Sequence, residues 1–424
     1  MIKKIKTDIV IVGCGVSGLF TALNLPEDKK IHIITKGKKE ESDSFLAQGG
    51  ICVLKSEDDF EDFYNDTLKA GHYENNPESV KTMISSSVKI IEKLIEFGVD
   101  FEKNGNGEFE YTKEGAHSKP RILFHKDETG KEITSKLLDR VLSLPNVTLS
   151  ENATMVDILK NEDTCYGIIC HDEDMNFTEI HADYTILATG GIGGLFKHST
   201  NYPHLTGDAI AIAIKHGIET KDIGYIQIHP TTLFTEEKER SFLISESARG
   251  EGAILLNSKG ERFVDELLPR DVVAKAIYEE MEKEGSDHVW LSFKNVPRKE
   301  IETHFPNIKN HCLKKGFDIT RDNIPIVPAQ HYFMGGIKID TDGKTDLNRL
   351  YAAGETACNG VHGKNRLASN SLLEGLVFAK RAAEHIKKSY SPLPEKEFKW
   401  DVNSFENYKE EYRNLVKEKI DKEK

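Results

Sequence analysis

The sequence predicts an α/β protein whose main domain is a doubly wound, Rossmann-like sheet, and three observations lead to this prediction. A short β-branched run at residues 8–12 enters a glycine-rich turn, and a helical stretch follows it and ends before Pro26. A second apolar run at 31–35 completes a strand–helix–strand unit, which is typical of parallel sheets. A later strand-like run, 184–188, enters another glycine cluster at 189–194, which indicates that the chain returns to the same sheet.

Hydrophobic spacing and turn residues predict the remaining elements in order. Residues 58–99 carry apolar side chains near helical spacing and close at Gly98, so a helical segment is expected there. The other expected elements are a helix at 133–142, strands at 147–160, 165–171, 337–340 and 350–353, and a helix at 371–387.

A change of texture marks a second domain. From residue 223 to 333, proline-punctuated loops alternate with helices such as 271–284, which indicates an inserted α+β capping domain. The expected organisation is a discontinuous main domain at 1–222 and 334–390, a capping and substrate domain at 223–333, and a short, charged, helical C-terminal segment at 391–424.

Composition and charge narrow the possible partners. The 424 residues are 38% hydrophobic, which allows more than one core, and the formal net charge of -13 argues against nucleic acid as a partner. No apolar run approaches the ~20 residues that span a bilayer, so no membrane partner is expected. The six cysteines are spread without a C-x-x-C pair, so no metal site is expected, and a reducing, cytoplasmic location fits best.

The first glycine-rich turn is the strongest cofactor signal. Its spacing, Gly13-x-Gly15-x-x-Gly18, follows a strand and opens a helix, where free amides and the helix dipole can hold a pyrophosphate. The second strand ends at Thr35-Lys36, whereas nicotinamide sites usually carry Asp or Glu there, and this difference favours FAD. Lys36 is either a cofactor contact or a solvated lysine at the strand end. The turn residues expected at the cofactor are Gly13, Cys14, Gly15, Val16, Ser17 and Gly18.

Five segments together resemble one family. Through these segments, which occur in the expected order, residues 8 to about 387 are similar to the flavoproteins of the succinate dehydrogenase, fumarate reductase and L-aspartate oxidase family. The segments are Gly13-Cys-Gly-Val-Ser-Gly18, Ala47-Gln-Gly-Gly50, His229-Pro-Thr-Thr232, Arg249-Gly-Glu-Gly252 and His362-Gly-Lys-Asn-Arg-Leu-Ala-Ser-Asn-Ser-Leu-Leu-Glu374.

The resemblance implies FAD contacts beyond the first turn. Taken alone, Asp208 would be interpreted as a helix cap and Glu355 as a solvated loop acid. In respiratory members a histidine four residues before Ala-Gln-Gly-Gly bonds covalently to FAD; this chain has Asp43 there, so non-covalent FAD is expected. The implied contacts are Ala47, Gln48, Gly49 and Gly50 beside the isoalloxazine, Asp208 and Glu355 at the flavin and ribose, and Ser371 and Leu372 at a helix start facing the flavin. Lys36 and Ser44 are also expected to contact the cofactor.

The resemblance also implies a site that oxidises a dicarboxylate. Hydride transfer to a flavin requires groups that hold each carboxylate, a proton acceptor and a dry site. Taken singly, each candidate histidine would be structural, and Arg366 would be a surface arginine. Its planar guanidinium nevertheless suits a carboxylate gripped at two points. The residues implied for substrate binding are Gln227, His229, Ser245, His331 and Arg366.

Proton transfer is implied for Arg270, with a relay through Glu246 and Arg249. The ordinary interpretation of Arg270 is an arginine in the first turn of a helix, paired with Asp271. Guanidinium stays protonated until about pH 12, so neighbouring charges would have to make proton exchange possible.

Glu114 is the candidate for substrate selection. Succinate and aspartate differ by one ammonium group, so a selective site needs an anion near C2. Glu114 lies in Lys113-Glu-Gly-Ala-His-Ser-Lys-Pro-Arg-Ile122, which is similar to a segment of the aspartate-oxidising members. Without that context, Glu114, His117 and Arg121 would be interpreted as surface loop residues.

The resemblance then implies FAD-dependent oxidation of L-aspartate to iminoaspartate. The family passes this product to quinolinate synthase in NAD biosynthesis, and oxygen or fumarate would reoxidise the flavin. The first alternative is a soluble fumarate reductase or a succinate dehydrogenase flavoprotein subunit, which Asp43 and Glu114 both disfavour. The second is a non-catalytic FAD-binding protein, which is disfavoured by the joint presence of Arg270, His229, His331 and Arg366.

Overall fold

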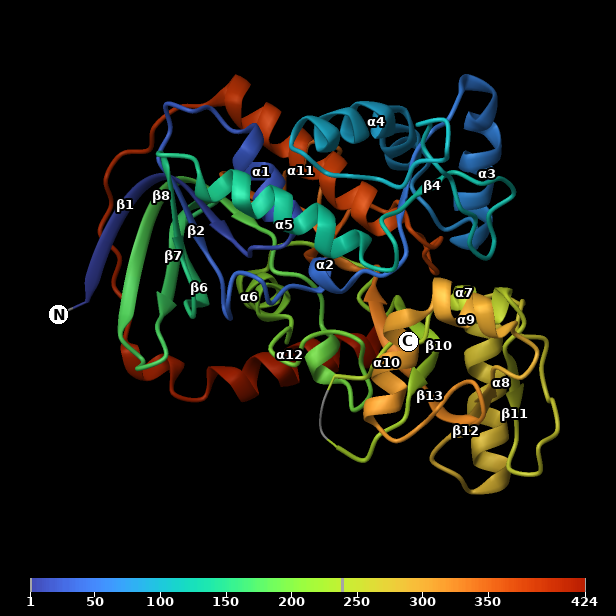
Figure 1. Cartoon of the computed structure of the whole chain (residues 1–424). Coiled ribbons are helices and arrows are strands. Elements are labelled where there is room, and N and C mark those ends of the chain that lie inside the picture. Colours follow the sequence, from blue (N-terminus) through green and yellow to red (C-terminus); the bar gives the residue numbers. More distant parts are fainter. Residues whose placement is uncertain (1, 238–239, 424) are drawn as a thin grey trace.

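The computed structural model describes residues 2–237 and 240–423, which form the layered α/β molecule of Figure 1. Its helices are α1 (Val16–Asn24), α2 (Asp43–Leu46), α3 (Phe60–Ala70), α4 (Pro77–Glu96), α5 (Thr129–Leu142), α6 (Asp208–His216), α7 (Glu246–Gly250), α8 (Arg270–Glu284), α9 (Arg298–His304), α10 (Pro306–Lys314), α11 (Asn370–Ser389) and α12 (Tyr408–Glu423). Its strands are β1 (Lys3–Val12), β2 (Ile31–Ile34), β3 (Ile51–Cys52), β4 (Ile122–Leu123), β5 (Val147–Ser150), β6 (Thr154–Asn161), β7 (Thr164–His171), β8 (Phe177–Leu187), β9 (Thr220–Lys221), β10 (Ile226–Leu233), β11 (Ile254–Leu256), β12 (Val289–Ser292), β13 (Ile324–Phe333), β14 (Gly336–Lys338), β15 (Leu350–Ala352) and β16 (Ala357–Cys358).

The main sheet confirms the predicted α/β core. Its strand order is β5-β2-β1-β8-β7-β6, and β15 also pairs with β8. Ile9 of β1 lies opposite Ile31 of β2 and Tyr184 of β8, both in parallel register. The two glycine-rich turns after β1 and β8 therefore emerge at the same edge of the sheet. Strands β6, β7 and β8 form an antiparallel meander, so the sheet is mixed.

Helices cover both faces of this sheet. In Figure 1, α1 and α11 lie above it, and α6 and α12 lie below it. The helices of each pair contact each other, and α6 also packs against β6. The apolar side chains at Ile9, Val10 and Ile11 are fully buried between these layers, as expected for a strand covered on both faces.

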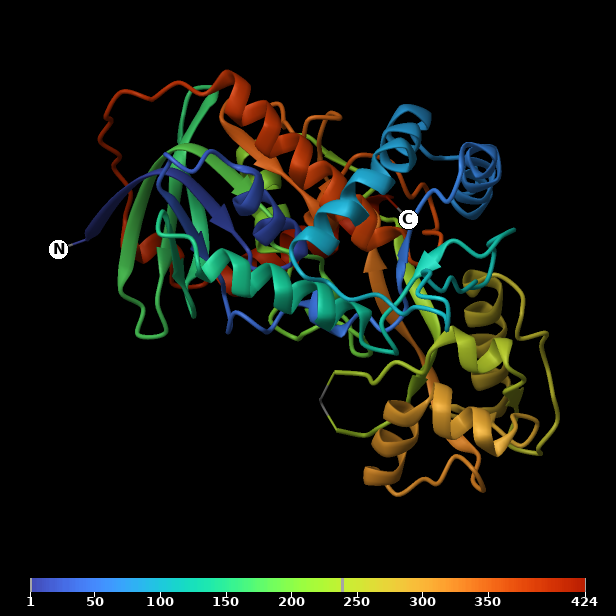
Figure 2. The ribbon, with the colours of Figure 1, turned by 45° about the horizontal axis from the view of Figure 1, so that its top comes forward.

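A second hydrophobic core lies within the inserted segment. Its buried residues run from Leu233 to Ile326, and the sheet beside it has the order β10-β13-β12-β11. Figure 2 shows this part, with α8, α9 and α10, projecting away from the main sheet. Because β10 and β13 connect it to the main domain, Gln227, His229 and His331 lie at the junction of the two cores.

Two expected helical segments differ in the structure. Residues 58–99 form two helices, α3 and α4, because the chain turns at 71–76 and Asn76 caps α4 ahead of Pro77. The C-terminal segment is helical only in α12 and a 3-10 turn at Val402–Phe405, and residues 391–400 are irregular. Pro392 and Pro394 prevent a helix there.

The helices and the cysteines of the described chain bear on the expectations for membrane and metal partners. No helix within residues 2–237 and 240–423 is long and apolar enough to cross a membrane. All six cysteines are free and buried, and burial raises the pKa of the Cys14 thiol to about 12. The cysteines therefore behave as core residues rather than as reactive thiols.

Helix α12 packs against the main domain through one buried face. Tyr412, Val416 and Ile420 form its buried face, and the Tyr412 hydroxyl donates to the Val156 carbonyl at 2.5 Å. Ile420→Ala removes buried methylenes from this face, so we expect unfolding to become easier by about 2 kcal/mol, the low end for such truncations because the last turn can relax. Denaturant unfolding would measure this. Lys417→Ala, on the exposed face of the same helix, is the control, and equal losses in the two variants would show that α12 is not packed as described.

Candidate active site

One elongated cleft runs from the glycine-rich turn of the main sheet to the capping domain. Three residues expected at the site, Gly18, Gln227 and Arg249, lie behind its wall rather than on it. The expected residues that line it are Gly13, Cys14, Gly15, Val16, Ser17, Lys36, Ser44, Ala47, Gln48, Gly49, Gly50, Glu114, Asp208, His229, Ser245, Glu246, Arg270, His331, Glu355, Arg366, Ser371 and Leu372.

The glycine-rich turn leaves room for a phosphate group. Gly13 has φ +115, and a Cβ there would lie 2.0 Å from the Ala188 carbonyl oxygen, so only glycine fits. Gly18 lies behind the turn, where a Cβ would meet the Gly13 carbonyl at 2.1 Å, so it allows the close packing of strand and helix. The Val16 amide at the start of α1 donates to Ser44 Oγ at 3.1 Å, and the first turn carries no acidic residue. The amides that follow in the first turn are therefore suited to an anion such as a pyrophosphate.

Lys36 is held in an ion pair and is not a freely solvated lysine. Its Nζ lies 2.7 Å from Asp208 Oδ2 and 2.9 Å from Thr206 Oγ1, and all three residues line the cleft. Sequence reasoning missed Thr206. Its position two residues before Asp208, with the left-handed Gly207 between them, could have indicated that Thr206 lies at the site.

Several buried polar atoms in the cleft have no hydrogen-bond partner among the residues that the structure describes. These atoms are Ser42 Oγ, Asp43 Oδ2, Gln48 Oε1 and Asn201 Oδ1. Buried polar atoms are nearly always hydrogen-bonded, so this part of the wall fits a ligand with many donors and acceptors. A dinucleotide with a polar ring system, such as FAD, has this character.

Two carboxyl groups, Asp43 and Glu355, share this buried wall. Asp43 Oδ1 accepts from the Tyr202 amide at 2.9 Å, and Glu355 Oε1 accepts from the Phe333 amide at 2.9 Å. Burial raises the pKa of Asp43 to about 7, and burial together with the charge of Asp43 raises the pKa of Glu355 to about 8. The wall therefore holds protons at neutral pH that ordinary carboxyl groups would have lost.

Donors for carboxylates converge at the capping end. His331 Nδ1 bonds Thr200 Oγ1 at 2.8 Å, and His229 Nδ1 accepts from the Thr231 amide at 3.2 Å, so Nε2 is the nitrogen of each ring that can bind a ligand. Burial lowers the pKa of both histidines well below the usual value, so both are neutral. Their ring centroids lie 5.4 Å apart, close enough to contact one small molecule.

Arg366 is the buried cation of this end. Its Nη1 donates to Ser371 Oγ at 3.1 Å, its guanidinium lies 4.6 Å from the centroid of the Tyr332 ring, and its Nε has no partner. Burial and the charge of Arg270 lower the pKa of Arg366 to about 10. No carboxylate of the described residues forms an ion pair with Arg366, so an anionic ligand would complete its coordination.

Arg270 and Glu246 form the shortest ion pair in the cleft. Arg270 Nε donates to Glu246 Oε2 at 2.6 Å, and Arg270 Nη1 donates to Gln227 Oε1 at 3.2 Å. Arg249 Nη2 lies 3.8 Å from the same Glu246 oxygen, on the side away from the cleft. Burial raises the pKa of Glu246, but Arg270 and Arg249 outweigh this effect, so its pKa is lowered and it is ionised. The expected relay residues are therefore in contact, with Gln227 and Arg249 supporting Arg270 and Glu246 from behind.

Glu114 lies where the cleft narrows beside the Ala47–Gly50 segment. Its Oε2 accepts from Ser369 Oγ at 2.6 Å, and a Cβ on Gly49 would lie 2.7 Å from its Oε1. Burial raises the pKa of Glu114. Sequence reasoning missed Ser369, although it lies within the segment 362–374 from which Ser371 and Leu372 were selected.

The raised pKa of Asp43 predicts a pH-dependent effect of Asp43→Asn. The folded protein holds a proton on Asp43 that the unfolded chain loses near pH 4, and this contribution to stability disappears as the pH rises through about 7. Asparagine does not titrate, so the melting temperature of the FAD-free variant should rise relative to the parent between pH 5 and pH 8. Thermal melts at four pH values test this, with the exposed Asp139→Asn as control. A melting temperature of the variant that falls relative to that of the parent as the pH rises over this range contradicts the buried carboxyl.

The chain is similar to known FAD-binding proteins. The family described as FAD binding domain matches residues 8–372. L-aspartate oxidase of Clostridium perfringens is 53% identical over 380 residues, covering 89% of this chain and 86% of that protein. L-aspartate oxidase of Clostridium acetobutylicum is 50% identical over 388 residues, covering 91% and 89%. Among solved structures, E. coli quinol fumarate reductase superimposes with a TM-score of 0.85 at 26% identity, covering 99% of this chain and 75% of that one.

The identities and the coverage exceed what a shared fold alone would produce. The family match over residues 8–372 contains four of the five sequence segments whole and the fifth as far as Leu372. The chain therefore belongs to the FAD-binding flavoprotein family of succinate dehydrogenase, fumarate reductase and L-aspartate oxidase, and within it to the L-aspartate oxidases.

Proposed function

We propose that this chain oxidises L-aspartate to iminoaspartate with FAD held non-covalently in the cleft. The observation that supports this most strongly is the pairing of an uncompensated Arg366 with Glu114 across one small site. A dicarboxylate needs the cation, and an amine beside it needs the anion. Bound FAD supplies the hydride acceptor for the hydrogen at C2.

The carboxylates of the substrate are assigned to the neutral histidines and the arginine. His229 and His331 each offer Nε2, and Arg366 offers its unpartnered Nε–H. Ser245, which caps α7, lies on the same wall and adds a hydroxyl. These groups fix the substrate without titrating near neutral pH, so binding should not vary with their protonation.

Proton removal is assigned to Arg270 and Glu246. Arg270 Nε donates to the ionised Glu246 at 2.6 Å, so transfer of this proton to the carboxylate would leave a neutral guanidine that can accept the proton lost by the substrate. Arg249, buried behind Glu246, stabilises its negative charge between transfers. This arrangement answers the difficulty of an arginine base, because the proton is carried by the pair and not by the guanidinium alone.

Non-covalent FAD is supported by the side chain at residue 43. Asp43 is bound through Oδ1 to the Tyr202 amide, and a carboxyl group lacks the ring nitrogen that bonds to flavin in the respiratory members. We further propose that oxygen or fumarate reoxidises the flavin. The same proposal places the enzyme in the cytoplasm, where its product would pass to quinolinate synthase for NAD biosynthesis.

Reduction of the flavin tests the proposed substrate. Under anaerobic conditions, L-aspartate should bleach the oxidised flavin band and succinate should not. Glu114→Gln removes the charge that faces the ammonium group, so half-maximal bleaching should need about 10- to 100-fold more L-aspartate. Glu110→Gln, an exposed residue of the same segment, is the control. Bleaching by succinate alone would reject this function and move the chain to the fumarate reductase branch.

Arg270→Gln tests the proton route. The amide keeps a hydrogen-bonding group near Gln227 but cannot carry a proton, so the rate of flavin reduction by L-aspartate should fall about 10²- to 10⁴-fold. Stopped-flow reduction measures this rate at saturating substrate. Arg298→Gln, on the exposed face of α9, is the matched control. A rate within threefold of the parent would remove Arg270 from the proton route.

A further inference from the structure

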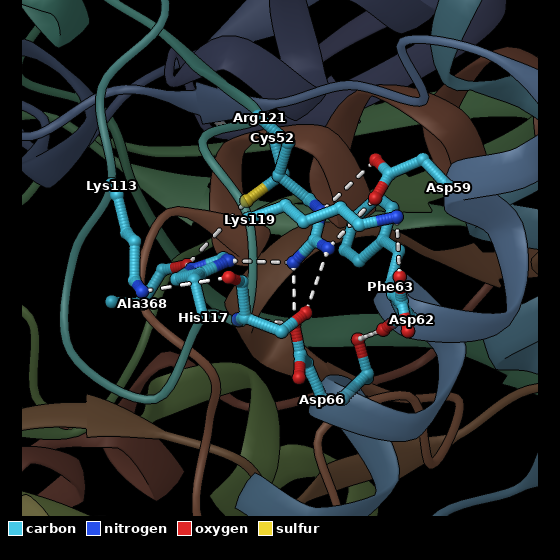
Figure 3. A network of polar contacts seen from close by, with 12 residues as sticks. Cys52, Asp59, Asp62, Phe63, Asp66, Lys113, His117, Lys119, Arg121 and Ala368 are labelled. Carbon is cyan, nitrogen blue, oxygen red and sulfur yellow. Dashed lines mark hydrogen bonds and ion pairs between the residues drawn. The ribbon is translucent and has the colours of Figure 1, made fainter.

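A buried polar network lies beneath the loop that carries Glu114 (Figure 3). At its centre is Arg121, which is fully buried. Its Nε and Nη2 donate to the two carboxylate oxygens of Asp59 at 3.1 and 2.9 Å, and its Nη1 donates to Asp66 Oδ2 at 2.6 Å. The guanidinium also lies 5.0 Å from the centroid of the Phe63 ring. The interpretation of Arg121 as a surface loop residue is therefore wrong, because two carboxylates from the α3 region compensate its charge.

Arg121 also fixes the tautomer of His117. Its Nη1 lies 3.2 Å from His117 Nδ1, and a guanidinium can only donate, so Nδ1 must accept. The proton of the neutral ring is then on Nε2, which donates to the Ala368 carbonyl at 3.0 Å. Burial lowers the pKa of His117 to about 4, so the ring stays neutral at physiological pH. Like Arg121, His117 is buried rather than exposed on a loop.

The hydrogen bond to Ala368 fixes the peptide that precedes Ser369. Ser369 has φ +61, the left-handed conformation that a side chain disfavours, so it needs support from its neighbours. The Ser369 carbonyl accepts from the Cys52 amide at 3.1 Å, and its Oγ accepts from the Gly50 amide at 3.2 Å. That hydroxyl then donates to Glu114 Oε2 at 2.6 Å. The orientation of the Glu114 carboxylate thus depends on a backbone held by His117.

The other side of the Glu114 loop lies against Glu246 of α7. A Cβ on Gly115 would lie 2.2 Å from Glu246 Oε1, so the loop already touches the capping domain. Ala116 has φ +65, a second left-handed residue in the same turn. Glu114 and Ser369 line the cleft, whereas His117 and Arg121 do not. The network can therefore act on a ligand only through Glu114 and Ser369.

We propose that His117, held by Arg121, is a positioning residue that sets the selectivity for the substrate ammonium group. It does so by orienting Ser369, which in turn orients Glu114. The inference rests on the proposed function, because it assumes that Glu114 faces an amine. Loss of the His117 link should weaken recognition of the ammonium group while the sites for the two carboxylates stay intact.

Two ligands that cannot be oxidised at C2 separate these effects. 2-Methyl-L-aspartate keeps the amine and both carboxylates but has no hydrogen at C2. 2,2-Dimethylsuccinate replaces the ammonium group by a methyl group of similar size. The perturbation of the flavin spectrum measures the dissociation constant of each. In His117→Phe, which keeps a ring but neither hydrogen bond, we expect the constant for 2-methyl-L-aspartate to rise about tenfold. The constant for 2,2-dimethylsuccinate should change less than about twofold.

Matched variants separate positioning from general damage. His117→Gln keeps one donor and one acceptor and should recover most of the lost selectivity. Lys119 lies in the same loop as His117 and forms an exposed ion pair with Asp62 of α3. Lys119→Ala breaks only this ion pair and should change neither dissociation constant. If His117→Phe does not retain FAD, Ser369→Ala interrupts the same chain at its last link and should give the same selective loss.

The outcomes distinguish this inference from the proposed function. Suppose that L-aspartate bleaches the wild-type protein, but His117→Phe, or Ser369→Ala in its place, raises the dissociation constants of both ligands equally or of neither. The positioning role is then overturned, while the proposed function stands. If wild-type protein is not bleached by L-aspartate, the proposed function fails and this inference fails with it. Selective loss in the phenylalanine variant with recovery in the glutamine variant supports the positioning role.

Discussion

The uncompensated positive charge buried at Arg366 is the constraint on which the rest of the cleft depends. A buried guanidinium without a carboxylate is costly, and its pKa of about 10 reflects both burial and the nearby Arg270. Arg270 has its own counterion in Glu246, so the pair adds little net charge. One carboxylate of a ligand would relieve the cost at Arg366. In the proposed function, Glu114 would then distinguish an amino dicarboxylate from a plain one.

The fold delivers these charges from separate parts of the chain. Strands β10 and β13 pair in antiparallel register and carry His229 and His331 to the junction of the two cores. The start of α8 contributes Arg270, and the segment before α11 contributes Arg366 and Ser369. The main sheet brings the glycine-rich turn to the far end of the same cleft. The Glu114 loop packs against Glu246 at the start of α7, since a Cβ on Gly115 would lie 2.2 Å from Glu246 Oε1.

Local patterns in the sequence predict much of this arrangement, but they do not predict long-range pairing. The unit β1-α1-β2 follows from hydrophobic spacing and glycine positions, and most cleft residues follow from motifs. The turn at 71–76 was missed, although these residues break the apolar spacing and Asn76-Pro77 is typical of a helix start. Arg121 is different in kind. Its polar loop sequence suggests exposure, and its burial depends on Asp59 and Asp66 arriving from more than fifty residues away. No local sequence pattern predicts such a long-range contact.

A crystal structure of the FAD-bound protein with 2-methyl-L-aspartate tests the central claim most directly, because this ligand keeps every charged group of L-aspartate and cannot be turned over. We predict that the ammonium nitrogen of the ligand lies within hydrogen-bonding distance of the Glu114 carboxylate. We also predict that the Arg366 guanidinium binds one carboxylate of the ligand. An ammonium group directed away from Glu114, or a ligand carboxylate that leaves Arg366 without a partner, would contradict it.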